Sequence, residues 1–169
     1  NENPDKNIIN GLYMLFTDYP KNRDMKKAQK YADLYAKYWG YEPKSLHRIG
    51  LFELFGINRA QNAQAGLELL KKAVSYENAA ATETLAYAYE KGIGVEKDET
   101  RAKQYLDALR RLKPNYVSLA DSYIRGRYGI EDIDRAKFIL KLGADEGSEN
   151  AANNLKEFDS FLEKVRGNG

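Results

Sequence analysis

Hydrophobic residues recur along the chain with helical spacing, in segments separated by short polar or glycine-containing stretches. The clearest example is the stretch of residues 85–109. There Leu85 and Tyr89 share one apolar face, Gly92 can end a helix in a left-handed conformation, and Asp98 can cap the next helix. This stretch therefore predicts two short amphipathic helices joined by a glycine-containing loop.

The same arrangement recurs through most of the sequence. In four places an Asp or Asn stands four residues before a small residue, and the small residues follow at intervals of 38, 36 and 34 positions: Ala28, Gly66, Ala102 and Ala136. A second set of small residues is expected on the first helix of each pair, facing the second helix: Gly11, Gly50, Ala86 and Ala120. Intervals of this length are typical of helix-turn-helix repeats.

We therefore predict an all-α fold, an α/α superhelix or right-handed solenoid of about four helix-turn-helix repeats with a C-terminal capping helix. The chain is expected to form a single domain, 1–169, and Pro114 is expected to open the first helix of the fourth repeat. The predicted repeats span about 5–40, 41–77, 78–112 and 113–147, and the capping helix spans 148–166.

The first predicted helix, about residues 5–17, is apolar on more than one side. A terminal repeat normally has a polar outer face, so two interpretations remain open. Either the neighbouring helices and the polar residues before it cover this helix, or it is a contact surface through which an oligomer forms.

The central residues resemble a known repeat family. Similarity to the Sel-one-like repeat, a relative of the tetratricopeptide repeat, is carried by Leu85, Ala86, Tyr89, Gly92, Gly94, Val95, Asp98, Arg101, Ala102 and Tyr105. The resemblance implies a non-enzymatic scaffold or adaptor, of bacterial origin, that binds a protein partner on its concave face. It also implies an alternative, an immunity protein that neutralises a co-encoded secreted toxin or lipase effector.

Composition narrows the classes of function. The chain has 27 Lys and Arg against 25 Asp and Glu, a balance that disfavours nucleic acid as a partner. It has no cysteine and one histidine, His47, which we expect at the surface or in a second layer. We therefore predict no catalytic residues, no cofactor and no metal site.

The location of the protein is left open by the sequence. No apolar run approaches the 18 residues of a membrane span, and residues 1–6 lack a signal-peptide pattern. A periplasmic or secreted location is slightly favoured over a cytoplasmic one. One local basic cluster, a solvated face or an electrostatic docking site, consists of Lys21, Arg23, Lys26, Lys27 and Lys30.

The candidate binding residues follow from the repeat register. In stacked two-helix repeats the first helices line the concave face, so we chose the positions one, four and five residues after each small residue. The predicted partner-binding residues are Leu12, Leu15, Phe16, Leu51, Leu54, Phe55, Tyr87, Glu90, Lys91, Asp121, Ile124 and Arg125. This face changes from apolar to charged along its length. The alternative, that its leucines and phenylalanines are core between repeats, remains open.

Overall fold

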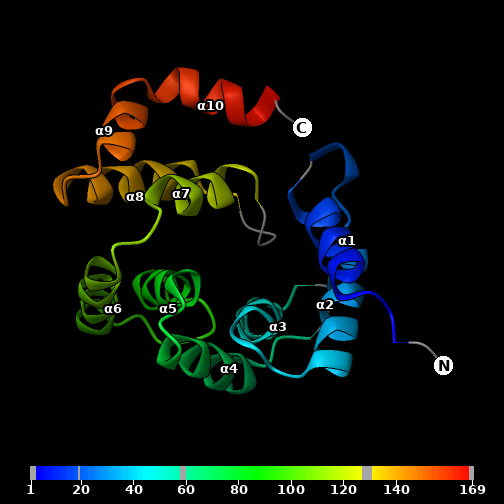
Figure 1. Ribbon diagram of the computed structural model, residues 1–169. Helices are drawn as coiled ribbons and strands as arrows, with labels where there is room; N and C mark the ends of the chain where they lie inside the picture. Colours follow the sequence, from blue (N-terminus) through cyan, green and yellow to red (C-terminus); the bar gives the residue numbers. More distant parts are fainter. Residues whose placement is uncertain (1–2, 19, 58–59, 127–130, 168–169) are drawn as a thin grey trace. The chain divides into compact units, whose positions relative to one another are not determined.

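The computed structural model describes residues 3–18, 20–57, 60–126 and 131–167. Within these ranges the chain forms ten α-helices and one short 3-10 helix, and it contains no strand (Figure 1). The predicted all-α fold is thus confirmed. By internal contacts the chain divides into two compact units, Asn1–Tyr13 with Met25–Pro114, and Met14–Asp24 with Asn115–Gly169. We call these the first and the second unit.

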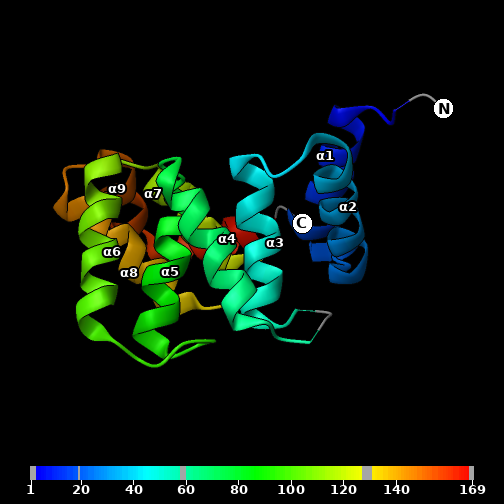
Figure 2. The ribbon, with the colours of Figure 1, turned by 90° about the horizontal axis from the view of Figure 1, so that it is seen from below.

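The first unit consists mainly of helix pairs. They are the first part of α1 (Lys6–Asp18) with α2 (Met25–Trp39), then α3 (Pro43–Phe55) with α4 (Ala63–Ser75), and α5 (Ala79–Lys91) with α6 (Glu99–Leu112). Figure 2 shows α3, α4, α5 and α6 lying side by side. The apolar faces of three of these helices meet in a fully buried core of Leu46, Leu54, Leu70, Ala73, Ala81, Leu85 and Ala88.

The pairing of α3 with α4 depends on two glycines. A Cβ added to Gly66 would lie 2.5 Å from the Leu54 nitrogen and 2.8 Å from the Gly50 carbonyl oxygen. A Cβ added to Gly50 would in turn lie 2.9 Å from Cγ of Leu70. The two backbones therefore approach closely enough to exclude any side chain between them, as the sequence predicts for this pair of small residues.

The predicted helix ends are also found. The Asn62 and Asp98 side chains accept hydrogen bonds from the backbone N–H groups of Ala65 and Arg101, at 3.1 and 2.9 Å, and so cap α4 and α6. Gly92 ends α5 in the left-handed region, with φ of 69°, where a side chain would be strained. Asn78 caps α5 in the same way as Asn62 caps α4, a cap that the sequence analysis did not predict.

The first helix departs from the prediction. A Cβ added to Gly11 would meet nothing within 4 Å, so the expectation that Gly11 faces its paired helix is wrong. Ile9 and Tyr13 are buried, whereas Ile8 is 62% and Met14 42% exposed. Ile8 and Met14 therefore remain in solvent, on opposite sides of the buried stripe that contains Ile9 and Tyr13.

The second unit contains α7 (Tyr116–Ile124), α8 (Ile133–Asp145), α9 (Glu149–Lys156), α10 (Phe158–Gly167) and the short helix η1 (Pro20–Asn22). Asp132 caps α8 by accepting a hydrogen bond from the Arg135 N–H at 2.8 Å, as predicted. Pro114 does not open α7. Asn115 is the capping residue, because its side chain accepts from the Ser118 N–H, and the helix begins at Tyr116.

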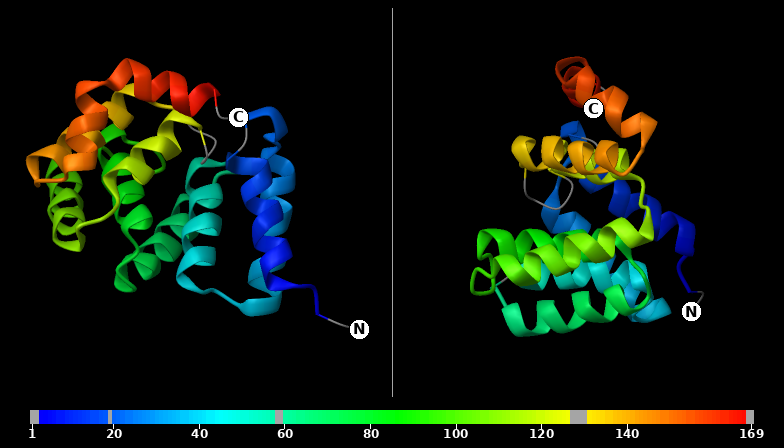
Figure 3. Two further views of the ribbon diagram at one scale, coloured as in Figure 1. Left: turned by 45° about the horizontal axis from the view of Figure 1, so that its top comes forward. Right: turned by 90° about the vertical axis from the view of Figure 1, so that its left-hand side faces the viewer.

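The predicted single capping helix is two helices. α9 ends at Lys156, Glu157 leaves helical geometry with φ of −108° and ψ of 41°, and α10 continues in a new direction (Figure 3). Hydrophobic spacing continues through the break, which is why the sequence pattern alone does not reveal it. The apolar side of α10 is buried through Phe161 and Val165.

Candidate functional site

The predicted partner-binding residues of the first unit are largely buried. Leu54 is 0%, Leu51 2% and Tyr87 5% exposed, and the Tyr87 ring packs edge-on against Phe55 with centroids 6.4 Å apart. Glu90 is partly buried and pairs with the exposed Lys91 at 3.3 Å. Leu51, Leu54 and Tyr87 are thus core residues, which for the two leucines is the alternative that the sequence left open, whereas Phe55, Glu90 and Lys91 are partly or fully exposed. That this set binds a partner stays a prediction.

Helix geometry explains the burial of Leu54. Residues four apart lie on the same face of a helix, so Leu54 shares the face of Gly50, which packs against α4. The same reasoning applies to Ile124, which follows the fully buried Ala120 by four residues and is 3% exposed. Position four after the small residue is therefore a core position in α3 and α7, and the part of Ile124 in binding a partner stays a prediction.

On α1, the predicted residues Leu12, Leu15 and Phe16 are each partly buried. Leu12 belongs to the first unit, and Leu15 and Phe16 belong to the second. Their part in binding stays a prediction, as does an oligomer formed through this helix.

The charged residues predicted on α7 form an ion pair in the second unit. Nε of Arg125 donates to both carboxylate oxygens of Asp121, at 2.9 and 3.0 Å. The side chains are only 15% and 19% exposed, so water screens this pair less than it screens a surface pair. The pair fixes both side chains along the outer face of α7, between the linings of two pockets.

The first of these pockets is a groove lined by polar side chains from α7 and α9. It has a volume of about 390 Å³, Phe161 of α10 is its buried apolar contact, and Val117 adds a second. The polar lining consists of Asn115, Ser118, Asp121, Asn150 and Asn154. Amide side chains both donate and accept hydrogen bonds, so this lining can pair with the N–H and C=O groups of an extended peptide.

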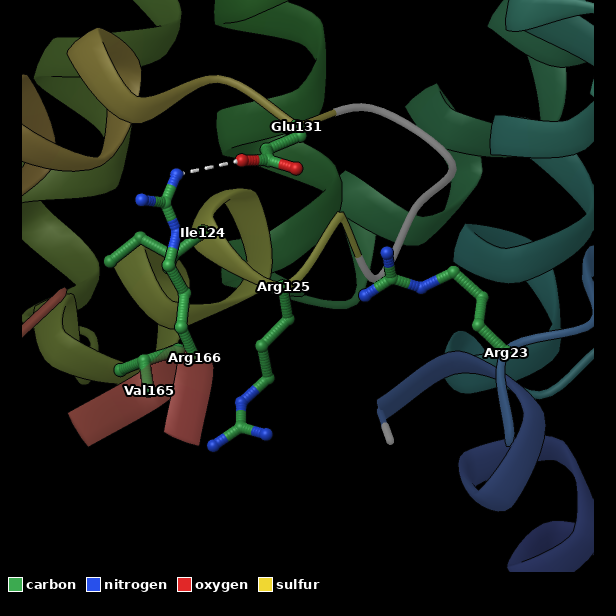
Figure 4. Close-up of a pocket in the computed structure, with 6 residues that line it drawn as sticks. All are labelled: Arg23, Ile124, Arg125, Glu131, Val165 and Arg166. Atoms are coloured by element: carbon green, nitrogen blue, oxygen red, sulfur yellow. Dashed lines mark hydrogen bonds and ion pairs between the residues drawn. The ribbon is translucent and has the colours of Figure 1, made fainter. Parts of the chain in front are cut away.

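The second pocket is smaller, about 130 Å³, and it is rich in arginine (Figure 4). Its lining consists of Arg23, Ile124, Arg125, Glu131, Val165 and Arg166. In Figure 4 the guanidinium of Arg166 is turned toward Glu131, to which it donates at 3.1 Å, while Arg23 enters from the opposite side. The two pockets are adjacent along α7, because Asp121 lines the groove and Arg125 lines the arginine pocket.

Three of the predicted partner-binding residues, Asp121, Ile124 and Arg125, line the pockets, and their part in binding a partner stays a prediction. Asn150 and Asn154 were missed because they belong to the predicted cap, although their four-residue spacing places both on one helix face. Arg23 appeared only as a member of the basic cluster, and nothing in the sequence predicts its contact with residues a hundred positions away.

The single histidine lies in the interior. His47 is 6% exposed, and its Nε2 lies 3.2 Å from the hydroxyl oxygen of Thr84, which itself donates to the Ala80 carbonyl. Burial, with a smaller contribution from Arg48, lowers the pKa of His47 to about 3. His47 thus occupies the core between α3 and α5, so of the two predicted positions, the surface and a second layer, the surface is wrong.

The part of the chain that the structure describes also bears on membrane and metal binding. No helix there is both long enough and apolar enough to cross a bilayer. The same residues include no group of three or more histidine, aspartate or glutamate side chains suited to a metal ion.

Comparison with known structures identifies similar folds. A Sel1 repeat protein from Oxalobacter formigenes is 22% identical, with a TM-score of 0.54 over 90% of this chain and 63% of its own. The structure of c5321, a protective antigen of uropathogenic Escherichia coli with an SLR fold, is 19% identical, with a TM-score of 0.52 over 89% of this chain and 32% of its own. The chain thus spans less than two thirds of either protein. Both come from bacteria, which fits the predicted origin.

Comparison of the sequence with known families gives a direct assignment. No curated protein sequence matches the chain significantly. The model of the Sel1 repeat matches three segments, residues 43–75, 79–108 and 116–148, which together make up more than half of the chain. The three segments coincide with the helix pairs α3–α4, α5–α6 and α7–α8. Proteins built from this repeat are generally scaffolds for protein–protein interaction. The chain belongs to the Sel1 repeat family.

Proposed function

We propose that this chain is a non-enzymatic scaffold that binds an extended peptide segment of a partner protein in the groove over α7 and α9. The observation that carries the proposal is the lining of that groove. Three asparagines, Asn115, Asn150 and Asn154, surround it together with Ser118 and Asp121. Asn115, Ser118 and Asn150 are exposed, and a peptide backbone offers donors and acceptors along its length that match such side chains.

The local hydrogen bonds support a preformed groove. Nδ2 of Asn154 donates to the carbonyl oxygen of Asn150 at 2.7 Å, and the side chain of Asn115 is held by capping α7. Arg125 holds Asp121 in place. Groups that are already oriented lose less conformational entropy when a ligand binds, which increases affinity for a given set of contacts.

The groove also offers an apolar contact. Phe161 and Val117 line it beside the polar groups, so one apolar side chain of a peptide can be buried while its backbone pairs with the amides. A catalytic role finds no comparable support, because the only histidine is buried and hydrogen-bonded to Thr84. An immunity protein would be a special case of this function, in which the partner is a toxin.

Selection from a random peptide library on the immobilised, folded chain tests the proposal. The selected peptides are then measured by calorimetry against the double variant Asn150→Ala, Asn154→Ala. Loss of the two amides is expected to weaken binding roughly tenfold or more, since each removes hydrogen bonds at a buried contact. Asn153→Ala is the matched control, because Asn153 is exposed on the same helix and does not line the groove.

The proposal fails under either of two results. One is that no peptide is enriched over the library background. The other is that the enriched peptides bind the double variant as tightly as the unchanged chain. Thermal unfolding of both variants, followed by circular dichroism, shows whether lost binding reflects lost structure.

A further inference from the structure

The arginine pocket beside the groove differs from it in size and charge. With about 130 Å³, it is smaller than the roughly 300–1,000 Å³ of typical ligand pockets, so it suits a single functional group. Its walls carry three arginines, and the buried side chains of Ile124 and Val165 form an apolar part of the lining. Such an enclosure strengthens any electrostatic interaction made inside it.

Two of the three arginines already have acidic partners. Arg125 pairs with Asp121 at 2.9 Å, and Arg166 pairs with Glu131 at 3.1 Å. Arg23 is different. Its Nε and Nη2 atoms are buried, and no acceptor in the described part of the chain lies within hydrogen-bond distance of either. Among the residues that the structure describes here, three guanidinium groups thus stand beside two carboxylates, and Arg23 is the one whose charge has no acidic partner.

The two unsatisfied atoms of Arg23 lie on the same edge of its guanidinium group. Nε–H and Nη2–H point in nearly parallel directions, and this edge can donate to both oxygens of one carboxylate at once. A guanidinium group stays charged at all relevant pH values, so leaving these two donors buried without an acceptor is unfavourable. Arg23 lines the pocket, so an oxyanion bound there would supply an acidic partner for its charge.

We propose that the arginine pocket binds one carboxylate group of the bound peptide, an Asp or Glu side chain or the C-terminal carboxylate, through the guanidinium group of Arg23. The inference rests on the proposed function, because it assigns a chemistry to the partner held in the neighbouring groove. The groove and the arginine pocket are within reach of one peptide, since Asp121 of the groove and Arg125 of the pocket are one helical turn apart.

The charge of the pocket favours a carboxylate over a phosphate group. One excess positive charge matches one negative charge. A phosphate monoester carries about −1.5 to −2 at neutral pH, and its second charge would be placed near the carboxylate of Glu131 without a partner. The pocket therefore selects for an acidic residue rather than a phosphorylated one.

The test uses nuclear magnetic resonance of the ¹⁵N-labelled full chain, in which the Nε–H groups of arginines give separate signals. The probes are the capped tripeptide Ala-Glu-Ala, its Ala-Gln-Ala counterpart, sodium acetate and phosphoserine, at matched ionic strength. We expect the glutamate peptide and acetate to shift the Nε–H signal of Arg23 saturably, and the glutamine peptide to leave it unchanged. Arg23→Gln should weaken binding of the glutamate peptide, read from the backbone amide of Arg125, roughly tenfold.

Lys21→Gln is the matched control. It removes the same charge two positions away, but Lys21 is exposed and does not line the pocket, so binding of the glutamate peptide should persist. Equal loss in both variants would show a general effect of net charge and would overturn the proposal. A response at Arg23 to phosphoserine at lower concentration than to the glutamate peptide would overturn the choice of carboxylate.

Binding of the library-selected peptides to the variants distinguishes a failure of this inference from a failure of the proposed function. If their affinity falls in the Asn150→Ala, Asn154→Ala variant and not in Arg23→Gln, the groove binds peptides and the carboxylate site is wrong. If no peptide binds the chain, the proposed function itself fails. If acidic peptides dominate the selection and bind both the Asn150→Ala, Asn154→Ala variant and the Arg23→Gln variant more weakly than the unchanged chain, both proposals hold.

Discussion

Gly66 of α4 lies against Gly50 of α3, so closely that a Cβ on Gly66 would stand 2.8 Å from the Gly50 carbonyl oxygen. This contact sets the spacing of the helix pair at the centre of the first unit. The side chain of Leu70 fills the space beside Gly50, and the backbone of Leu54 lies against Gly66. The pair of small residues is therefore a packing requirement of the repeat.

Gly66→Ala should destabilise the first unit. The added methyl group meets backbone atoms that cannot move aside, so we expect a loss of about 1–3 kcal/mol in the free energy of unfolding. Gly11→Ala is the control, because a Cβ there meets nothing within 4 Å and alanine favours the helix by about 0.5–1 kcal/mol. Urea denaturation of both variants measures the difference, and equal stabilities would contradict the close approach.

Leu54→Ala should act as a core substitution. Leu54 is fully buried in the cluster with Leu46 and Leu70, so its truncation is expected to cost about 2–5 kcal/mol. Lys91, taken from the same set of predicted binding residues, is exposed, and Lys91→Ala should change stability by less than about 0.5 kcal/mol. Thermal melts of the two variants would refute this assignment if Leu54→Ala unfolded at the temperature of the unchanged chain.

Stability should fall as the pH is lowered through the range of His47. The pKa of His47 is about 3 in the folded chain and about 6.5 in the unfolded chain, so the unfolded state takes up a proton first. The contribution of this group to the free energy of unfolding is fully present above pH 6.5 and decreases as the pH is lowered toward 3. Between pH 7 and pH 5 the expected loss is about 2 kcal/mol.

Urea midpoints at several pH values measure this dependence. No second histidine contributes, since His47 is the only one in the sequence. In His47→Gln the slope between pH 5 and pH 7 should largely disappear. The same slope in both proteins would mean that other groups cause the effect.

The ion pair of Asp121 and Arg125 should contribute a small but measurable coupling. A double-mutant cycle with alanine at each position is expected to give about 0.5–1 kcal/mol, because the pair is partly buried and one helical turn apart. Lys141 and Asp145 form a pair with the same spacing and reversed order, at 65% and 62% exposure, and serve as the comparison. A larger coupling for this exposed pair would contradict the effect ascribed to burial.

Removal of the Asp98 cap should weaken α6. Asp98→Ala leaves the Arg101 N–H without its acceptor and is expected to cost about 1 kcal/mol. Lys97→Ala, one position earlier and exposed, should change stability by less than about 0.5 kcal/mol. Chemical denaturation of the pair provides the comparison, and a cost shared by both variants would rule out capping as the cause.

The features that sequence reasoning predicted correctly are local ones. The helix pairs, the caps at Asn62, Asp98 and Asp132, and the left-handed end at Gly92 each depend on a few neighbouring residues. Their spacing gives the repeat directly, and with it the family. The break at Glu157 was missed because apolar spacing continues across it, and the backbone change lies in a single residue.

The candidate site was predicted less well, because it depends on which face each helix turns toward its neighbours. Asp121 and Arg125 line the pockets from α7, but Leu54 was included among the candidate binding residues, with a core position left open, although it shares the face of Gly50. Arg23 could not have been found, since its pocket combines residues distant in sequence. Secondary structure follows from short-range patterns, whereas a pocket follows from tertiary contacts.

The contacts that attach α1 within the first unit depend on ionic strength. Lys6 donates to Glu42 at 2.7 Å, Glu42 also accepts from Tyr35 at 2.9 Å, and the Arg48 guanidinium lies over the Tyr13 ring. The Lys6–Glu42 pair is partly exposed and therefore weakened by dissolved ions. The first turn of α1 is therefore sensitive to ionic strength. At high salt it should fray and exchange its amide hydrogens, while α3 and α4, which pack through Gly50 and Gly66, stay protected from exchange.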